Sequence, residues 1–229
     1  GSKVFVAGGN ASGKASNRVF YIDEATDKQW KQLPDFPGEA RVQPVLAAVE
    51  KENDTLLYVL GGFFGGDATK APTMGEKVLA FSLKQQQWQE VGVQESPNKE
   101  IFSLTGATAL AIDNRYIACF GGVNHRLFIN TITDLYHLGK DTTLTDEQRK
   151  QKNYDYMSHY MTQPIEYYQF NKECYLFDTH SQQWSVLDTQ ADFARAGATL
   201  VGTPAEFYLV QGELKPGVRS PKTYRLKIN

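Results

Sequence analysis

Pairs of consecutive glycines end short apolar runs along this 229-residue chain. The copies are Val6–Gly9, Val59–Gly62 and Cys119–Gly122, and a fourth run, Val210–Glu213, has Gly-Glu where the others have Gly-Gly. A repeat with a period of tens of residues is one supersecondary unit, which buries its apolar face only by stacking against its neighbours. The glycine pairs therefore predict an architecture of similar, stacked units.

Each unit has the sequence pattern of four short strands. In the second copy the apolar runs are 45–49, 55–60, 77–82 and 87–91. Turn-forming residues separate them, which is typical of a four-stranded antiparallel blade. Three copies then carry a tryptophan in the same phase, at Trp30, Trp88 and Trp184. We expect these indoles to occupy equivalent positions in successive blades and to pack between blades.

The glycine pair, the aromatic residue on the next strand and the later tryptophan resemble the kelch motif of β-propellers. The resemblance covers essentially the whole chain and implies an all-β fold, a single kelch propeller domain over residues 1–229. The first copy begins at a second strand and the last ends at a third, so about three and a half blades are expected. Because ring closure removes unpaired strand edges, we expect a missing segment or a second chain to complete the ring.

Composition excludes several classes of function. The formal net charge is −2, and 24 basic residues stand against 26 acidic ones without a basic run; nucleic acid is therefore not an expected partner. No apolar run reaches the length of a membrane helix, so no membrane partner is expected. Two cysteines are too few for a disulfide scaffold. Cys119 and Cys174 are predicted to be buried thiols, with a cross-strand bridge left open.

The third copy carries a long insertion, residues 123–172, where the other copies have a short loop. Thr145 is followed three residues later by Gln148, which predicts a capping box at the start of a helix. No glycine or proline follows until Pro164, and several tyrosines argue against disorder. Two interpretations stay open for this helical insertion: a packing support on one face, or a lid over the central channel on the side of Glu213.

The fourth copy continues as Gly212-Glu-Leu-Lys-Pro-Gly-Val-Arg219. An acid and a base on either side of a Pro-Gly turn could face one small molecule. Glu213 could transfer a proton, and Arg219 could hold a carboxylate with two parallel hydrogen bonds. From the spacing alone, a surface ion pair that stiffens the turn is the alternative.

This motif, the blades before it and Gly139-Lys-Asp141 in the insertion resemble the bacterial N-acetylneuraminate epimerases, the sialic acid mutarotases. The resemblance implies a six-bladed kelch propeller, an isomerase that exchanges α- and β-anomers by acid–base ring opening, and Glu213 and Arg219 as its catalytic pair. It implies a sugar acid as ligand and no cofactor or metal. The blade that begins at residues 3–9 precedes the other blades here, but it resembles one that follows the Gly-Glu motif in these enzymes. The resemblance therefore implies the cyclically permuted branch of the family. A periplasmic or otherwise exported location is also implied, and a cytoplasmic one stays open.

Four further residues are predicted to bind the substrate. Sialic acid carries a carboxylate on its anomeric carbon, which a cation in the pocket would complement. Arg41 and Arg195 precede the first strands of their blades in similar phase, and Asn10 and Asn124 follow glycine pairs. For each of the four, capping of a turn is the alternative.

Two other functions are known for kelch blades. A non-catalytic kelch propeller that binds a protein or carbohydrate is the first, and the Glu213 motif and the insertion argue against it. A copper oxidase with kelch blades is the second. Such an enzyme needs clustered histidine and tyrosine ligands, and the four histidines are scattered.

Overall fold

The computed structural model describes residues 2–203 and 205–227. Blade 1 is a sheet of β1 (Lys3–Ala7), β4 (Val19–Asp23) and β5 (Lys31–Leu33). Blade 2 runs β6 (Val42–Lys51), β7 (Asp54–Phe64), β9 (Lys77–Ser82) and β10 (Gln87–Val93), with β8 (Thr73–Met74) beside β7. Blade 3 runs β11 (Thr108–Ile112), β12 (Tyr116–Phe120), β13 (Glu173–Asp178) and β14 (Gln183–Thr189). Blade 4 runs β15 (Thr199–Thr203), β16 (Glu206–Val210) and β19 (Thr223–Leu226).

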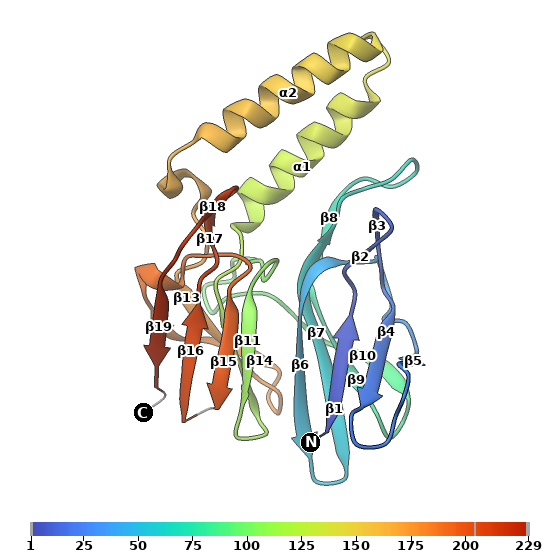
Figure 1. The fold of residues 1–229 in the computed structure, drawn as a ribbon, viewed down its shortest axis with the longest axis vertical. Coiled ribbons are helices and arrows are strands. Elements are labelled where there is room, and N and C mark those ends of the chain that lie inside the picture. Colours follow the sequence, from blue (N-terminus) through green and yellow to red (C-terminus); the bar gives the residue numbers. More distant parts are fainter. Residues whose placement is uncertain (1, 204, 228–229) are drawn as a thin grey trace.

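Every pairing within these blades is antiparallel. Two short hairpins, β2 (Asn10–Ala11) with β3 (Lys14–Ala15) and β17 (Glu213–Lys215) with β18 (Val218–Arg219), complete the strands. The blades stand side by side with two helices above one end (Figure 1). The predicted all-β fold of four-stranded blades is confirmed, with blades 1 and 4 each showing three strands among the described residues.

The backbone of the glycine pair is the same in all four blades. Its two residues have positive φ, at Gly8-Gly9, Gly61-Gly62, Gly121-Gly122 and Gln211-Gly212. Val210 lies opposite Thr199 as Phe120 lies opposite Thr108, which fixes the same register in blades 3 and 4. The alignment of Gly212-Glu213 with the pair was therefore wrong by one residue. Gln211-Gly212 is the fourth pair, and Glu213 is the residue that follows it.

The first residue of the pair is glycine where another blade packs closely against it. A Cβ atom on Gly121 would lie 2.1 Å from the carbonyl oxygen of Arg195, which leads into blade 4. A Cβ atom on Gly61 would lie 2.6 Å from the carbonyl carbon of Leu104, which leads into blade 3. Gln211 has the same left-handed backbone, but its side chain is exposed. The close approach of the next blade, together with the positive φ, explains the glycine.

The tryptophans join each blade to the one before it. Trp88 lies opposite Phe81 on β10, and Trp184 lies opposite Phe177 on β14. Their indole N–H groups donate to the carbonyl oxygens of Pro34 and Val93 in the preceding blades, each at 2.9 Å. The predicted equivalence and packing of these two are confirmed. Trp30 directly precedes β5 and is 49% exposed; its packing between blades stays a prediction, because no blade precedes blade 1 among the described residues.

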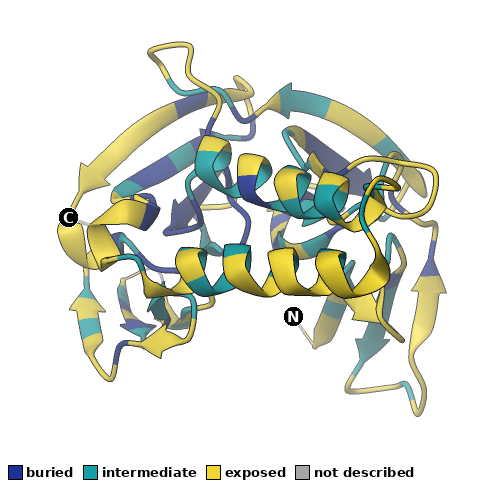
Figure 2. Ribbon diagram, turned by 90° about the horizontal axis from the view of Figure 1, so that it is seen from above, coloured by how far each residue is buried: buried dark blue, intermediate teal, exposed yellow. Residues whose placement is uncertain are grey.

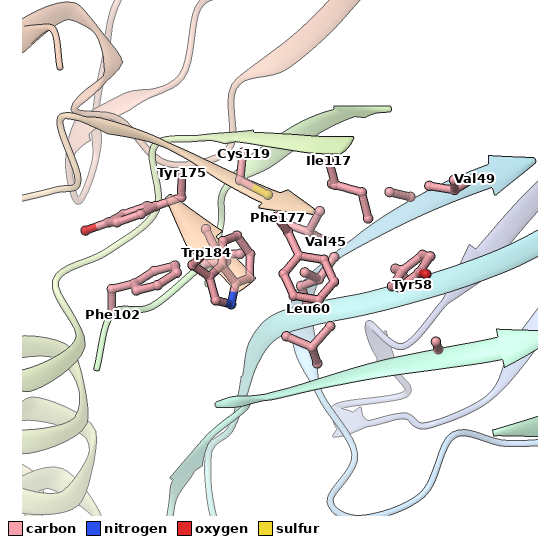
Figure 3. Packing of buried hydrophobic residues seen from close by; sticks show 14 residues of the cluster. Val45, Val49, Tyr58, Leu60, Phe102, Ile117, Cys119, Tyr175, Phe177 and Trp184 are labelled. Carbon is pink, nitrogen blue, oxygen red and sulfur yellow. The ribbon is translucent and has the colours of Figure 1, made fainter. Parts of the chain in front are cut away.

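The hydrophobic core lies between the blades. One cluster joins blades 2 and 3 and includes Val45, Leu60, Ile117, Phe177 and Trp184 (Figure 3). Two further clusters join blades 1 and 2 and blades 3 and 4. Because successive side chains point to opposite faces of a sheet, one blade contributes apolar side chains to the clusters on both of its faces.

Both cysteines are buried free thiols, and the cross-strand bridge that the sequence left open is not formed. Burial raises the pKa of the Cys119 thiol well above its usual value and that of Cys174 to about 12. Both side chains are therefore neutral core residues at physiological pH.

The insertion consists of α1 (His125–Lys140), α2 (Asp146–Thr162) and a short 3₁₀ turn, η1 (Ile165–Tyr168). The predicted capping box of Thr145 and Gln148 is present at the start of α2. Seen from above, the two helices run side by side across the blades (Figure 2). They lie at the same end of the blades as β17 and β18 (Figure 1), as predicted. Among the described residues, no helix combines the length and apolar character needed to cross a membrane.

Candidate functional site

In all four blades the chain leaves the sheet at the same end, just after the glycine pair. The chain leaves each blade there and returns at Ser16, Gly75, Asn171 and Ser220. Each returning N–H donates to the carbonyl of the second residue of the pair, at 2.8–3.0 Å. The four excursions, residues 10–15, 63–74, 123–170 and 213–219, therefore start from equivalent points. This end of the molecule gathers the segments that vary most between repeats.

Glu213 and Arg219 face each other across the short β17–β18 hairpin that emerges from blade 4. They are register partners in β17 and β18, and Arg219 Nη2 lies 3.5 Å from Glu213 Oε1. The Arg219 side chain is 67% exposed and that of Glu213 32%. Two backbone hydrogen bonds with Ala196, at 2.7 and 2.9 Å, hold Glu213 against the segment that leads into blade 4. The structure therefore brings the predicted acid and base together on an anchored hairpin that is open to solvent.

Arg195 lies beneath this hairpin and is only 2% exposed. Its Nη1 donates to the carbonyl of Gln211 at 2.6 Å, its Nε donates to Asp192 O at 2.8 Å, and its guanidinium lies over the Tyr224 ring. A buried cation is stabilised only by such partners. Arg195 thus holds the first residue of the fourth pair, two positions before Glu213.

Arg41 occupies the equivalent place in blade 2. Its Nη1 donates to the carbonyls of Gly61 and Lys77, at 3.2 and 3.1 Å. Burial lowers the pKa of Arg41 to about 10. In blade 3 the amide of Asn171 takes this role and donates to Gly121 O at 3.0 Å. The observed contacts of Arg41 and Arg195 are with the backbone, and substrate contact by either stays a prediction.

The two predicted asparagines lie at the starts of excursions. Asn10 is exposed in β2, opposite Ala15. Asn124 is the N-cap of α1, and its Oδ1 accepts a hydrogen bond from Leu127 N at 3.0 Å. Capping is therefore the observed contact of Asn124. Neither asparagine belongs to the hairpin of Glu213 and Arg219.

Lys215 connects the Glu213 hairpin to the insertion, a role that the sequence analysis missed. Its Nζ donates to Gln163 O at 2.7 Å and to Met161 O at 3.3 Å, at the end of α2. Carbonyls at a helix end lack partners within the helix, and a cation there also complements the helix dipole. In the sequence, the only indication of this role was that Lys215 lies between Glu213 and Arg219 in the motif.

The other side of the insertion rests on the excursion of blade 2. The rings of Phe63 and Phe128 meet at 4.9 Å, edge to face. Lys140 Nζ donates to Ala68 O at 2.6 Å. The helices therefore span from blade 2 to the Glu213 hairpin of blade 4, above the end where all excursions emerge.

Two cavities lie at this end, with volumes of about 680 and 370 Å³. Glu213 and Arg219 line neither of them. Arg41 lines the smaller, and Asn124 lines the larger. Among the described residues, no group of three or more His, Cys, Asp or Glu side chains is placed to hold a metal ion.

Comparison with known proteins places this architecture in a family. The profile of the N-acetylneuraminate epimerase family matches residues 2–229. The N-acetylneuraminate epimerases of Shigella flexneri and Escherichia coli strain K12 are each 30% identical over 215 residues, which cover 93% of this chain and 53% of theirs.

The solved structure of YjhT superposes with a TM-score of 0.78 at 26% identity, over 99% of this chain and 60% of that one. The chain thus spans about half the length of the curated relatives that it matches. The kelch fold and the family resemblance are confirmed: with blades, glycine pairs and the Glu213 motif in place, the chain belongs to the N-acetylneuraminate epimerase family.

Proposed function

We propose that this protein, within a complete ring, is an isomerase that interconverts the α- and β-anomers of a sialic acid. The observation that carries the proposal is the pairing of Glu213 with Arg219 on an anchored hairpin at the end where the four excursions emerge. Membership of the N-acetylneuraminate epimerase family supports the choice of substrate.

The reaction requires two proton transfers and no net change in composition. Glu213 takes the proton of the anomeric hydroxyl while an acid protonates the ring oxygen, and the bond between the anomeric carbon and that oxygen breaks. The open-chain ketone rotates, and the former ring hydroxyl attacks its other face with the proton transfers reversed. The same carboxyl can serve as base in one direction and as acid in the other.

Arg219 suits a binding role in this scheme. Its guanidinium stays protonated and does not exchange protons usefully. It offers a planar fork of donors to the carboxylate on the anomeric carbon. Because that carboxylate is bonded to the reacting carbon, Arg219 would fix the sugar close to the neighbouring Glu213.

The insertion is proposed to act as a lid on the same end. Lys215 and the ring contact of Phe63 with Phe128 attach it on both sides of the site. A cover that excludes water strengthens the electrostatic contacts beneath it. Arg41 and Arg195 are proposed to support the excursions from below, and their contact with the substrate stays a prediction.

Anomer exchange of freshly released α-sialic acid, followed by proton NMR on the complete natural protein, tests the proposal. Glu213→Gln should slow the exchange by about 10²–10⁴-fold, the usual contribution of a general acid or base. Arg219→Lys should weaken substrate binding, because a point charge does not reproduce the fork.

Glu206→Gln is the matched control. Glu206 forms the same kind of pair with Arg225, at 2.7 Å, in the same blade but away from the excursions. This variant should exchange anomers at the wild-type rate. A folded Glu213→Gln protein with wild-type exchange would remove Glu213 from the mechanism and favour the non-catalytic carbohydrate-binding alternative.

The exported location implied by the family resemblance also belongs to this proposal. The relatives described above are bacterial proteins. Fractionation of cells that produce the natural full-length protein should recover it outside the cytoplasm, and recovery in the cytoplasm would contradict the location.

A further inference from the structure

A separate cavity lies away from the Glu213 hairpin, beside blade 3. The cavity of about 680 Å³ is lined by blade 3, the loop that leads into it and the two ends of the insertion. This volume is within the range of small-molecule pockets. Six lining residues carry its chemistry: Glu100, Asn124, Arg126, Lys172, Glu173 and Tyr175.

Tyr175 provides the first sign that the cavity takes a ligand. Its ring stacks on Phe102, with centroids 3.8 Å apart and planes 10° apart. The residue is only 7% exposed, and its hydroxyl has no hydrogen-bond partner among the described residues. Figure 3 shows this hydroxyl at the end of the ring that points away from the apolar cluster. Because it is not one of the buried side-chain oxygens that lack a partner, this hydroxyl opens onto the cavity, where water or a ligand group can pair with it.

The start of α1 forms the opposite wall, where Arg126 and Lys172 supply positive charge and His125 is bonded to the carboxylate of Glu76 at 2.8 Å. Asn124 caps this sixteen-residue helix, whose first turn contains no acidic residue. Free N–H groups and the helix dipole favour an anion at such an end. Arg126 lies in the same first turn, and Lys172 follows the insertion where the chain returns to blade 3. A carboxylate in the cavity would find both charge and donors here.

The wall near Tyr175 has the opposite character. Glu173 begins β13 two residues before Tyr175, and Glu100 lies in the loop that leads into blade 3. Burial first, and then these two negative charges, raise the pKa of Tyr175 to about 12. The phenol therefore stays protonated and can donate a hydrogen bond, while the two carboxylates accept hydrogen bonds from hydroxyl groups.

We propose that this cavity binds a monosaccharide-sized sugar acid, separately from the Glu213 hairpin. Its carboxylate lies at the start of α1 between Arg126 and Lys172. Its hydroxyl groups pair with Tyr175, Glu100 and Glu173. The site binds without turnover, because Glu213 and Arg219 line another part of the surface. It goes beyond the proposed function, since a chain without isomerase activity could still bind here.

Calorimetric titration of the complete protein with D-glucuronate and with N-acetylneuraminate tests the site. Arg219→Lys serves as the background, because it weakens the hairpin site. We expect binding of both acids to persist in this background and D-glucose, which lacks the carboxylate, to show none.

Adding Tyr175→Phe removes one hydroxyl and keeps the ring stacked on Phe102. It should weaken binding about 3–10-fold, the net worth of one hydrogen bond. Adding Arg126→Gln instead should weaken binding about 10-fold, and this exposed position tolerates the change if Tyr175→Phe fails to fold. The control, Tyr154→Phe on the exposed face of α2, should change nothing.

Three results would overturn the proposal. One is loss of all binding in the Arg219→Lys background, which would leave only the hairpin site. Another is binding that neither Tyr175→Phe nor Arg126→Gln weakens. The third is equal binding of D-glucose, which would remove the need for the positive wall at α1.

Discussion

Blades 3 and 4 begin their excursions from the same backbone geometry and then diverge. Gly122 and Gly212 have φ of 99° each, and their carbonyls accept the returning N–H groups of Asn171 and Ser220 at 3.0 and 2.8 Å. Blade 3 then carries residues 123–170, with two helices and a large cavity at their base. Blade 4 carries only 213–219, a short hairpin with an acid and a base. One frame therefore supports both a two-helix insertion and a short hairpin that carries an acid and a base.

The shared backbone around the glycine pair, here called the frame, and the excursions that leave it differ in how strongly they restrict the sequence. The frame consists of backbone hydrogen bonds and of side chains that hold the carbonyls of the pair, and it restricts sequence at these side chains, where φ is positive and where another blade approaches. The excursions touch the frame at their ends, so their length and chemistry are free to vary. Loops on a rigid scaffold are where function concentrates. The following predictions test how far the two blades differ beneath this shared frame.

The largest expected difference is at the first residue of the pair. Gly121→Ala would place a Cβ atom 2.1 Å from Arg195 O on a left-handed backbone. We expect it to lower the free energy of unfolding by about 3 kcal/mol or more, a large loss for one substitution. Gln211→Ala, at the equivalent exposed position, should change it by less than about 0.5 kcal/mol. Urea unfolding followed by tryptophan fluorescence measures both, and equal losses would contradict the predicted difference.

The next difference concerns the side chain that holds the carbonyl of that residue. Asn171→Ala and Arg195→Met each remove the donor to a carbonyl of the pair. An unpaired buried group costs about 1–3 kcal/mol, so both variants should be destabilised in urea unfolding.

Only Arg195→Met should also slow anomer exchange, by about 10-fold or more, because Glu213 is anchored to the adjacent Ala196 and small displacements of reacting groups are costly. NMR exchange rates at saturating substrate separate this effect from binding. An equal slowing in Asn171→Ala would show that the two anchors are not specific to their own excursions.

A smaller effect is expected inside the insertion. Thr145→Ala removes the cap of α2 and should destabilise that helix by about 1 kcal/mol. Hydrogen exchange should quicken in residues 146–162 and stay unchanged in β12 and β13. Faster exchange in those strands would mean that the excursion and the frame unfold together.

The smallest effect should come from the link between the excursions. Lys215→Met keeps the apolar stem and removes the donor to Gln163 and Met161. Helix-end cations contribute about 0.3–1 kcal/mol, so hydrogen exchange at the end of α2 should rise slightly while the urea midpoint stays the same. Lys215→Arg should retain the protection, and no difference between the two variants would exclude the link.

Local patterns allowed much of the fold to be predicted. Strands followed from apolar runs between turn residues, α2 followed from Thr145 and Gln148, and Trp88 and Trp184 followed from their phase. Each of these signals is contained within a few residues. Trp30 shows the limit, because its exposure depends on whether another blade lies against it.

Two features could not be predicted because they depend on partners distant in the sequence. Gln211 takes the left-handed backbone of the pair, and nothing in its side chain indicates this. Arg195 donates to backbone carbonyls, whereas in the sequence a buried structural cation looks the same as a ligand-binding one. Glu213 and Arg219 could be paired from the sequence because a Pro-Gly turn lies between them, which makes their approach a local matter.

The direction of the tryptophan hydrogen bonds has a consequence for synthesis on the ribosome. Trp88 and Trp184 lie on the last strand of their blades, and each donates to a blade made earlier. A blade that has just left the exit tunnel therefore follows a docking partner that has already been synthesised. The nascent chain can add blades one at a time in the order of translation, and none has to wait for the blade that follows.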